Sequence, residues 1–155
     1  MNDKRGSKWR KWDLHVHTPA SLIHSFKPKD GDDVWETYIK DLENLPKEIQ
    51  VLGINDYIFI DGYRKVLEYK NNGRLANIQL ILPVIEFRIK KFGGHRQFKR
   101  INLHIIFSDQ IGPDIIQAQF LNGLSAKYSL APGLNQGITW GGLITKESLT
   151  DLGRK

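Results

Sequence analysis

The sequence predicts an α/β fold with a mainly parallel sheet and flanking helices. Strand-like and helix-like segments alternate up to residue 107, which is typical of parallel strands connected by helices. At 155 residues, the chain is also long enough to bury about 70% of its unfolded surface, so it can form a core without cross-links. We therefore expect a sheet whose functional groups gather at the carboxyl ends of its strands.

Hydrophobic periodicity predicts the elements in chain order. A first strand is expected at residues 12–17, where polar and apolar residues alternate until Thr18-Pro19. The pair Asp32-Asp33 can cap a helix whose apolar residues keep helical spacing between Val34 and Leu45. Further strands are expected at 50–54, at 78–89 with an interruption at Pro83, and at 101–107, and further helices at 62–70 and 113–124.

Composition excludes several classes of function. The chain has no cysteine, so disulfides, thiolate nucleophiles and cysteine-bound zinc are excluded, and metal ligands have to be His, Asp or Glu. The longest apolar run, residues 80–85, is too short for a membrane helix, and the basic N-terminus lacks an apolar signal core. We therefore expect a cytoplasmic protein without a membrane segment.

The formal net charge of +6 is concentrated in two segments. Residues 1–11 form a basic N-terminal tail, and residues 88–100 around Gly93-Gly94 form an expected basic loop without acidic residues. Such segments are either solvated surface or contacts for the phosphate groups of a partner. The candidate phosphate or nucleic-acid contacts are Arg88, Lys90, Lys91, Arg96, Lys99 and Arg100.

Histidines on strands supply candidate metal ligands. His15 and His17 alternate on the first strand, which predicts two imidazoles on one face with Cα atoms about 7 Å apart. Asp13 is expected on the same face, where it can bind the metal or orient a histidine. In the last strand, His104 shares a face with Asn102. Each histidine is either a metal ligand or a structural residue.

Carboxylates complete the candidate site. Glu86 lies in the apolar segment Pro83–Phe87, where an ionised carboxylate needs a partner. That partner is either Arg88, two residues further on, or a metal ion. Asp56 and Asp61 flank the end of the second strand and are typical of caps and turns. Glu86 and Asp56 are the candidate catalytic residues.

Four segments become informative when taken together: Lys11-Trp-Asp-Leu-His-Val-His-Thr-Pro-Ala-Ser21, Leu52-Gly-Ile-Asn-Asp-Tyr57, Leu82-Pro-Val-Ile-Glu86 and Asn102-Leu-His104. In order and spacing they resemble successive motifs of the PHP (polymerase and histidinol phosphatase) domain. The resemblance covers most of residues 11–107. It is closest to the N-terminal PHP domain of TrlF-type AAA/SMC-like ATPases, and Ile60-Asp-Gly-Tyr63 fits that type as well.

The resemblance implies a distorted (β/α)7 barrel, of which residues 1–155 would be a single incomplete domain. It also implies divalent metal ions such as Mn, Zn or Mg and the hydrolysis of phosphate esters. By this resemblance His15, His17, Glu86 and His104 would be metal ligands, and Glu86 would bridge metals. A phosphate ester or nucleic acid would be the substrate, and the barrel would be completed by downstream residues, an ATPase domain or a partner chain.

The chain also departs from the PHP pattern. Tyr57 stands where the second motif usually has His, Val84 where the third has Gly, and Leu22 where the first has Asp, and no histidine follows His104. The first hypothesis is a metal-dependent phosphoesterase, a nuclease included, within a larger nucleic-acid-directed or phage-defence ATPase. The second is a catalytically degenerate PHP-like module that binds nucleic acid or a partner ATPase. The third is an unrelated α/β domain with structural histidines.

Overall fold

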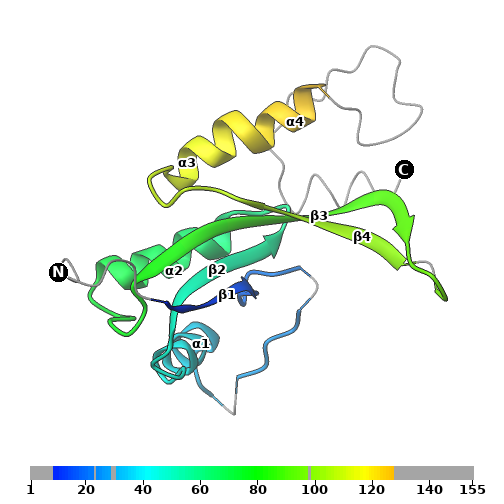
Figure 1. Cartoon of the computed structure of the whole chain (residues 1–155). Helices are drawn as coiled ribbons and strands as arrows, with labels where there is room; N and C mark the ends of the chain where they lie inside the picture. The colour runs from blue at the N-terminus through cyan, green and yellow to red at the C-terminus, as the bar shows by residue number, and fades with distance from the viewer. Residues whose placement is uncertain (1–8, 23, 29–30, 98, 128–155) are drawn as a thin grey trace.

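A curled four-stranded sheet forms the centre of the fold (Figure 1). The computed structural model describes residues 9–22, 24–28, 31–97 and 99–127. The strand order is β1-β2-β3-β4, with β1, β2 and β3 parallel and β4 antiparallel to β3. The elements are β1 (Lys11–Val16), α1 (Val34–Glu43), β2 (Ile49–Tyr57), α2 (Asp61–Asn71), β3 (Leu80–Gly93), β4 (Lys99–Ile106), α3 (Pro113–Ile115), the π-helical η1 (Ile116–Leu121) and α4 (Asn122–Lys127).

The predicted α/β class with a mainly parallel sheet is confirmed. The sheet is curled like one side of a barrel (Figure 1). The helix expected at residues 113–124 is one continuous helical segment, although its middle turns are π-helical. The strand expected at 50–54 is longer than expected, because polar Asn55 and Asp56 continue β2 as buried residues.

One hydrophobic core joins the helices to one face of the sheet. Ile54 of β2 and Ile85 of β3 point into it, while their neighbours Asn55 and Glu86 point to the opposite face. The second face of the sheet carries the polar residues Asn55 and Glu86 beside buried apolar residues such as Val84. The core contains Tyr38, Ile39, Leu42, Leu52, Ile54, Ile60, Tyr63, Val66, Leu75, Ile78, Ile81, Ile85, Ile116 and Leu121.

The predicted cap of the first helix is confirmed. Oδ1 of Asp33 accepts hydrogen bonds from the backbone N–H groups of Trp35 at 2.7 Å and Glu36 at 3.1 Å. These bonds satisfy two of the N–H groups that an α-helix leaves free at its start. The cap therefore sets where α1 begins, and the apolar face of the helix is turned towards the core.

The first strand contains a bulge that the sequence pattern did not predict. The register shifts between Asp13 and Val16, so that Leu14 and His15 both stand opposite Gly53. A Cβ atom on Gly53 would lie 2.8 Å from the Cα atom of Leu14, so only glycine permits this close approach. The expectation that Asp13 shares one regular face with the histidines is therefore wrong.

The basic segment, residues 88–100, lies mostly in strands, so the expected basic loop is corrected. β3 runs through Pro83 to Gly93 and β4 begins at Lys99, so the two strands form a hairpin, which we call the basic hairpin. Basic residues are tolerated there because β4 lies at an edge of the sheet. Pro83 does not interrupt β3: its carbonyl accepts from the N–H of Phe107, so the position without an N–H faces β4 and not β2.

A buried hydrogen-bond pair ties the end of β1 to the end of β2. Asp56 accepts hydrogen bonds from the backbone N–H of Thr18 at 3.0 Å and from its hydroxyl at 2.5 Å. Helix α2 starts directly against this pair: a Cβ atom on Gly62 would lie 2.0 Å from Oδ2 of Asp56 and 2.2 Å from Oγ1 of Thr18. Glycine at position 62 therefore allows α2 to pack onto the strand ends.

Some predictions fall on residues outside this description. They concern residues 1–8 of the basic tail. The sequence also predicts a glycine-rich loop at 131–142 and a short helix capped by Thr145, and both lie outside the described residues. Among the described residues, no helix has the length and apolar character required to cross a membrane.

Replacing Gly62 tests this packing. We expect Gly62→Ala to lower the free energy of unfolding by about 2 to 3 kcal/mol, because the added methyl group overpacks the Thr18–Asp56 pair. Urea denaturation followed by circular dichroism measures the change. Gly123→Ala is the matched control, since nothing lies within 4 Å of a Cβ atom there, and it should leave stability unchanged or raise it by up to about 1 kcal/mol. Equal stabilities of the two variants would contradict the packing argument.

Candidate metal centre

Strands β1 and β2 end beside the middle of β3, and we call this end of the sheet its carboxyl edge. His17 directly follows β1, and Tyr57 at the end of β2 is paired with Glu86 of β3. On the other side of β3, Glu86 is paired with His104 of β4. The topology therefore surrounds Glu86 with residues from the other three strands.

Glu86 is a buried carboxylate that two side-chain amides hold in place. Its side chain is 0% exposed. Oε2 accepts a hydrogen bond from the amide of Asn55 at 3.1 Å, and Oε1 accepts one from the amide of Asn102 at 2.5 Å. Amides carry no charge, and no described Lys or Arg side chain pairs with Glu86. Because an uncompensated buried charge is costly, this environment favours a bound cation.

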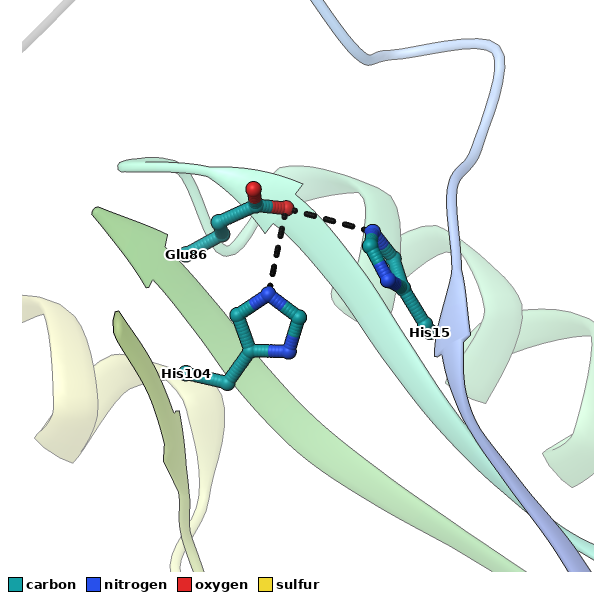
Figure 2. Close-up of side chains that lie close together, drawn as sticks. All are labelled: His15, Glu86 and His104. Atoms are coloured by element: carbon teal, nitrogen blue, oxygen red, sulfur yellow. Dashed lines mark ion pairs between the residues drawn. The ribbon is translucent and has the colours of Figure 1, made fainter. Parts of the chain in front are cut away.

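Imidazoles surround one oxygen of this carboxylate. The Nε2 atoms of His15 and His104 lie 3.4 and 3.7 Å from Oε2 of Glu86. Figure 2 shows the two rings turned towards the carboxylate from different strands. His15, Glu86 and His104 each offer one ligand atom, and these atoms all lie within 4.8 Å of one another. We call these three residues the metal group.

The metal group fits a divalent ion. Ligand atoms at about 2.0 to 2.1 Å from a tetrahedral Zn²⁺ are about 3.4 Å from one another, which is close to the separations of 3.4 and 3.7 Å found here. Imidazole nitrogens suit Zn²⁺ better than Mg²⁺ or Mn²⁺, which prefer oxygen ligands. Oδ1 of the neighbouring Asn55 is buried and has no hydrogen-bond partner among the described residues. It can accept a hydrogen bond from a water molecule at the ion.

His17, also a predicted ligand, lies beside the metal group. Its side chain is 12% exposed, and its Nε2 lies 3.8 Å from Oε2 of Glu86 and 3.0 Å from Nε2 of His15. Burial, reinforced by the neighbouring His24 and His15, lowers the pKa of His17 from 6.5 to about 4. The ring is therefore neutral at pH 7 and can donate a lone pair. Ligation by His17 remains a prediction.

Two aspartates act on the segment that carries the histidines. Asp56 binds Thr18, as described above, and its Oδ1 lies 3.8 Å from Nδ1 of His17. Asp13 accepts a hydrogen bond from the backbone N–H of His15 at 3.1 Å, next to the bulge. Both carboxylates thus position β1 and the residues after it. A catalytic role of Asp56 remains a prediction.

Arg88 has a different partner from the one that the sequence suggested. One of its Nη atoms donates a hydrogen bond to the hydroxyl of Tyr57 at 3.0 Å, and its guanidinium carbon lies 4.9 Å from the centroid of that ring. Of the two partners considered for Glu86, Arg88 is therefore not the one found among the described residues. The remaining alternative from the sequence is a metal ion.

The other predicted phosphate contacts lie on the basic hairpin. Arg96 lies in its turn and Lys99 begins β4, and both are exposed. Lys90, Lys91 and Arg100 belong to β3 and β4, but their side chains lie outside the described part of the structure. Because β3 continues beyond Glu86 while β2 ends at Tyr57, the hairpin projects past the edge that carries the metal group (Figure 1).

Three residues at this edge were not predicted as site residues. Asn102 had a signal, because it alternates with His104 and so shares its face. The sequence signal for Asn55 was weaker: the residue stands next to Asp56 in the second motif. His24 packs its ring 4.0 Å from that of His17, centroid to centroid. It lies in the connection between β1 and α1, where no periodicity predicts which way a side chain points.

Comparison with known proteins identified no relative of this chain. No protein-family model, curated protein or solved structure matches the chain. The resemblance to the PHP domain therefore remains an expectation from four sequence motifs. The functional interpretation rests on the metal group and its surroundings.

Removing the amide of Asn102 tests whether its hydrogen bond to Glu86 supports metal binding. We expect Asn102→Ala to weaken binding of Zn²⁺ or Mn²⁺ about tenfold, because the carboxylate of Glu86 loses the hydrogen bond that orients it. Isothermal titration calorimetry measures the affinity. Gln97→Ala removes another exposed amide from the same hairpin and should leave the affinity unchanged. An unchanged affinity in Asn102→Ala would show that this amide does not support the ligand.

Proposed function

We propose that this chain binds a divalent metal ion through His15, Glu86 and His104 and uses it to hydrolyse phosphate esters. The observation that carries the proposal is the environment of Glu86: a fully buried carboxylate held by neutral amides and facing imidazole nitrogens. A cation at this point balances the charge of Glu86 and takes up the lone pairs of the imidazoles. Of the divalent ions that the resemblance implies, Zn²⁺ suits the two imidazoles best.

The site is open enough for a substrate. The side chain of His15 is 51% exposed and that of His104 is 29% exposed, whereas Glu86 lies fully buried behind them. A bound divalent ion polarises a phosphoryl oxygen and lowers the pKa of a bound water. The chain's own residues hold the geometry: Asn55 and Asn102 fix the carboxylate, and Asp13 fixes the backbone at His15.

The basic hairpin supports a phosphate-bearing substrate. It projects from the edge that carries the metal group, and no acidic residue occurs between Glu86 and Asp109. Exposed cations concentrated beside a reaction centre attract polyanions and raise their local concentration. Nucleic acid is therefore the substrate class that we favour, in keeping with the PHP resemblance and with a place in a larger nucleic-acid-directed ATPase.

A second candidate function is binding without catalysis. β1 and β4 both lie at edges of the described sheet, and β4 exposes the apolar side chains of Ile101, Leu103 and Ile106. An edge strand with exposed apolar residues is suited to pairing with another chain. A PHP-like module that docks a partner ATPase or nucleic acid would use the outer strand β4 and the basic hairpin. Such a module would need no metal.

Metal binding and hydrolysis measured on the same samples test the proposal. We expect the wild type to retain one Mn²⁺ or Zn²⁺ ion after gel filtration and to hydrolyse bis(p-nitrophenyl) phosphate or a single-stranded oligonucleotide. The double variant His15→Ala/His104→Ala should lose both properties, because two of three ligands are removed. His95→Ala, an exposed histidine in the turn of the basic hairpin, should keep both.

The two candidate functions predict different results. Wild-type protein that binds metal but leaves every phosphate ester intact, and that still binds oligonucleotide, favours the binding module. Wild-type protein that binds neither metal ion would contradict the proposed metal centre. Retention of metal by the double variant would show that the metal is held elsewhere, and equal loss in His95→Ala would show that the loss is not specific to the proposed ligands.

A further inference from the structure

Arg88 is held in place by an uncharged side chain. Its guanidinium carbon lies over the ring of Tyr57, 4.9 Å from the centroid, and the guanidinium also donates a hydrogen bond to the hydroxyl of that residue. Tyr57 also packs against His17, whose ring lies 5.6 Å away and nearly parallel. Tyr57 itself is buried, so it is a fixed support for the exposed guanidinium.

Among the described residues, the positive charge of Arg88 is not paired with an acid. The other guanidinium groups that the described structure fixes by side-chain contacts are paired with acids: Arg64 with Asp114, and Arg74 with Glu36 and Glu43. No described acidic side chain pairs with Arg88. A phenol orients a guanidinium without neutralising it, so its remaining N–H donors keep their full attraction for an anion.

Arg88 is also close to the metal group. It follows Glu86 by two residues on β3, so the two side chains leave the same face of the strand with Cα atoms about 7 Å apart. Its partner across the ladder is Asn102, whose amide binds Glu86. An anion bound to a metal ion at Glu86 would therefore have its outer oxygens within the reach of the Arg88 side chain.

We propose that Arg88, positioned by Tyr57, is the anchor for the phosphate group of the substrate. The inference rests on the proposed function, since the anchored phosphate is the one presented to the metal group. Arg88 binds two phosphate oxygens through its planar fork, and Tyr57 is a positioning residue. The pair selects substrates with an anionic phosphoryl group over neutral esters. Beside the one metal group, the guanidinium of Arg88 would also supply a second, fixed positive charge.

Binding of inorganic phosphate tests the anchor directly. With protein loaded with Mn²⁺ and titrated in about 0.15 M salt, we expect Arg88→Met to weaken phosphate binding about tenfold or more, as for loss of a charge-assisted pair of hydrogen bonds. Tyr57→Phe keeps the stacked ring and loses the hydroxyl, so it should weaken binding about threefold. Lys47→Met removes an equal charge at the amino end of β2, the opposite edge of the sheet, and should change the affinity less than twofold.

The outcomes separate the anchor from the metal centre. Unchanged phosphate affinity in Arg88→Met, equal weakening by Lys47→Met, or no phosphate binding by the wild type would each overturn the anchor. If the wild type binds no metal, the proposed function fails, and an Arg88-dependent phosphate affinity measured in EDTA would still support the anchor. Should Arg88→Met not fold, Arg88→Lys serves instead: it keeps the charge but loses the fork, and affinity reduced about threefold or more supports the anchor.

Discussion

The buried carboxylate of Glu86 is the constraint on which the rest of the site depends. Its side chain is 0% exposed, yet the described residues around it provide only amide donors and imidazoles to balance its charge. A sheet interior tolerates such a group when a cation completes it. The imidazoles of His15 and His104 face the same oxygen, so a cation bound at Glu86 would also have nitrogen ligands within reach.

The fold positions these groups by dividing the two faces of the sheet. Helices pack against the face that contains Ile54 and Ile85, which leaves the face of Asn55 and Glu86 free for the site. Close packing at two glycines makes this arrangement possible. Gly53 admits the bulge at His15, and Gly62 admits α2 against the Thr18–Asp56 pair. The site is therefore carried by strands and strand ends that the core holds rigidly, and the basic hairpin extends from the same edge.

Much of this could be predicted from the sequence, because periodicity and burial report on strands directly. Alternation identified β1 and the face of His104, and the apolar surroundings of Glu86 indicated that its carboxylate needs a partner. The sequence could not show that Arg88 binds Tyr57, because that contact depends on how β2 and β3 align. The bulge and the packing of His24 on His17 likewise depend on tertiary contacts. The basic hairpin was expected as a loop because its charge pattern outweighs its strand propensity in a single sequence.

X-ray absorption at the zinc edge of the Zn²⁺-loaded protein tests the central claim most directly, because imidazole ligands add characteristic scattering beyond the first coordination shell. The account predicts a first shell of nitrogen and oxygen atoms at about 2.0 to 2.1 Å with imidazole scattering from His15 and His104, and less of this scattering in His104→Ala. A shell of oxygen atoms without imidazole scattering, or a spectrum unchanged in His104→Ala, would contradict it.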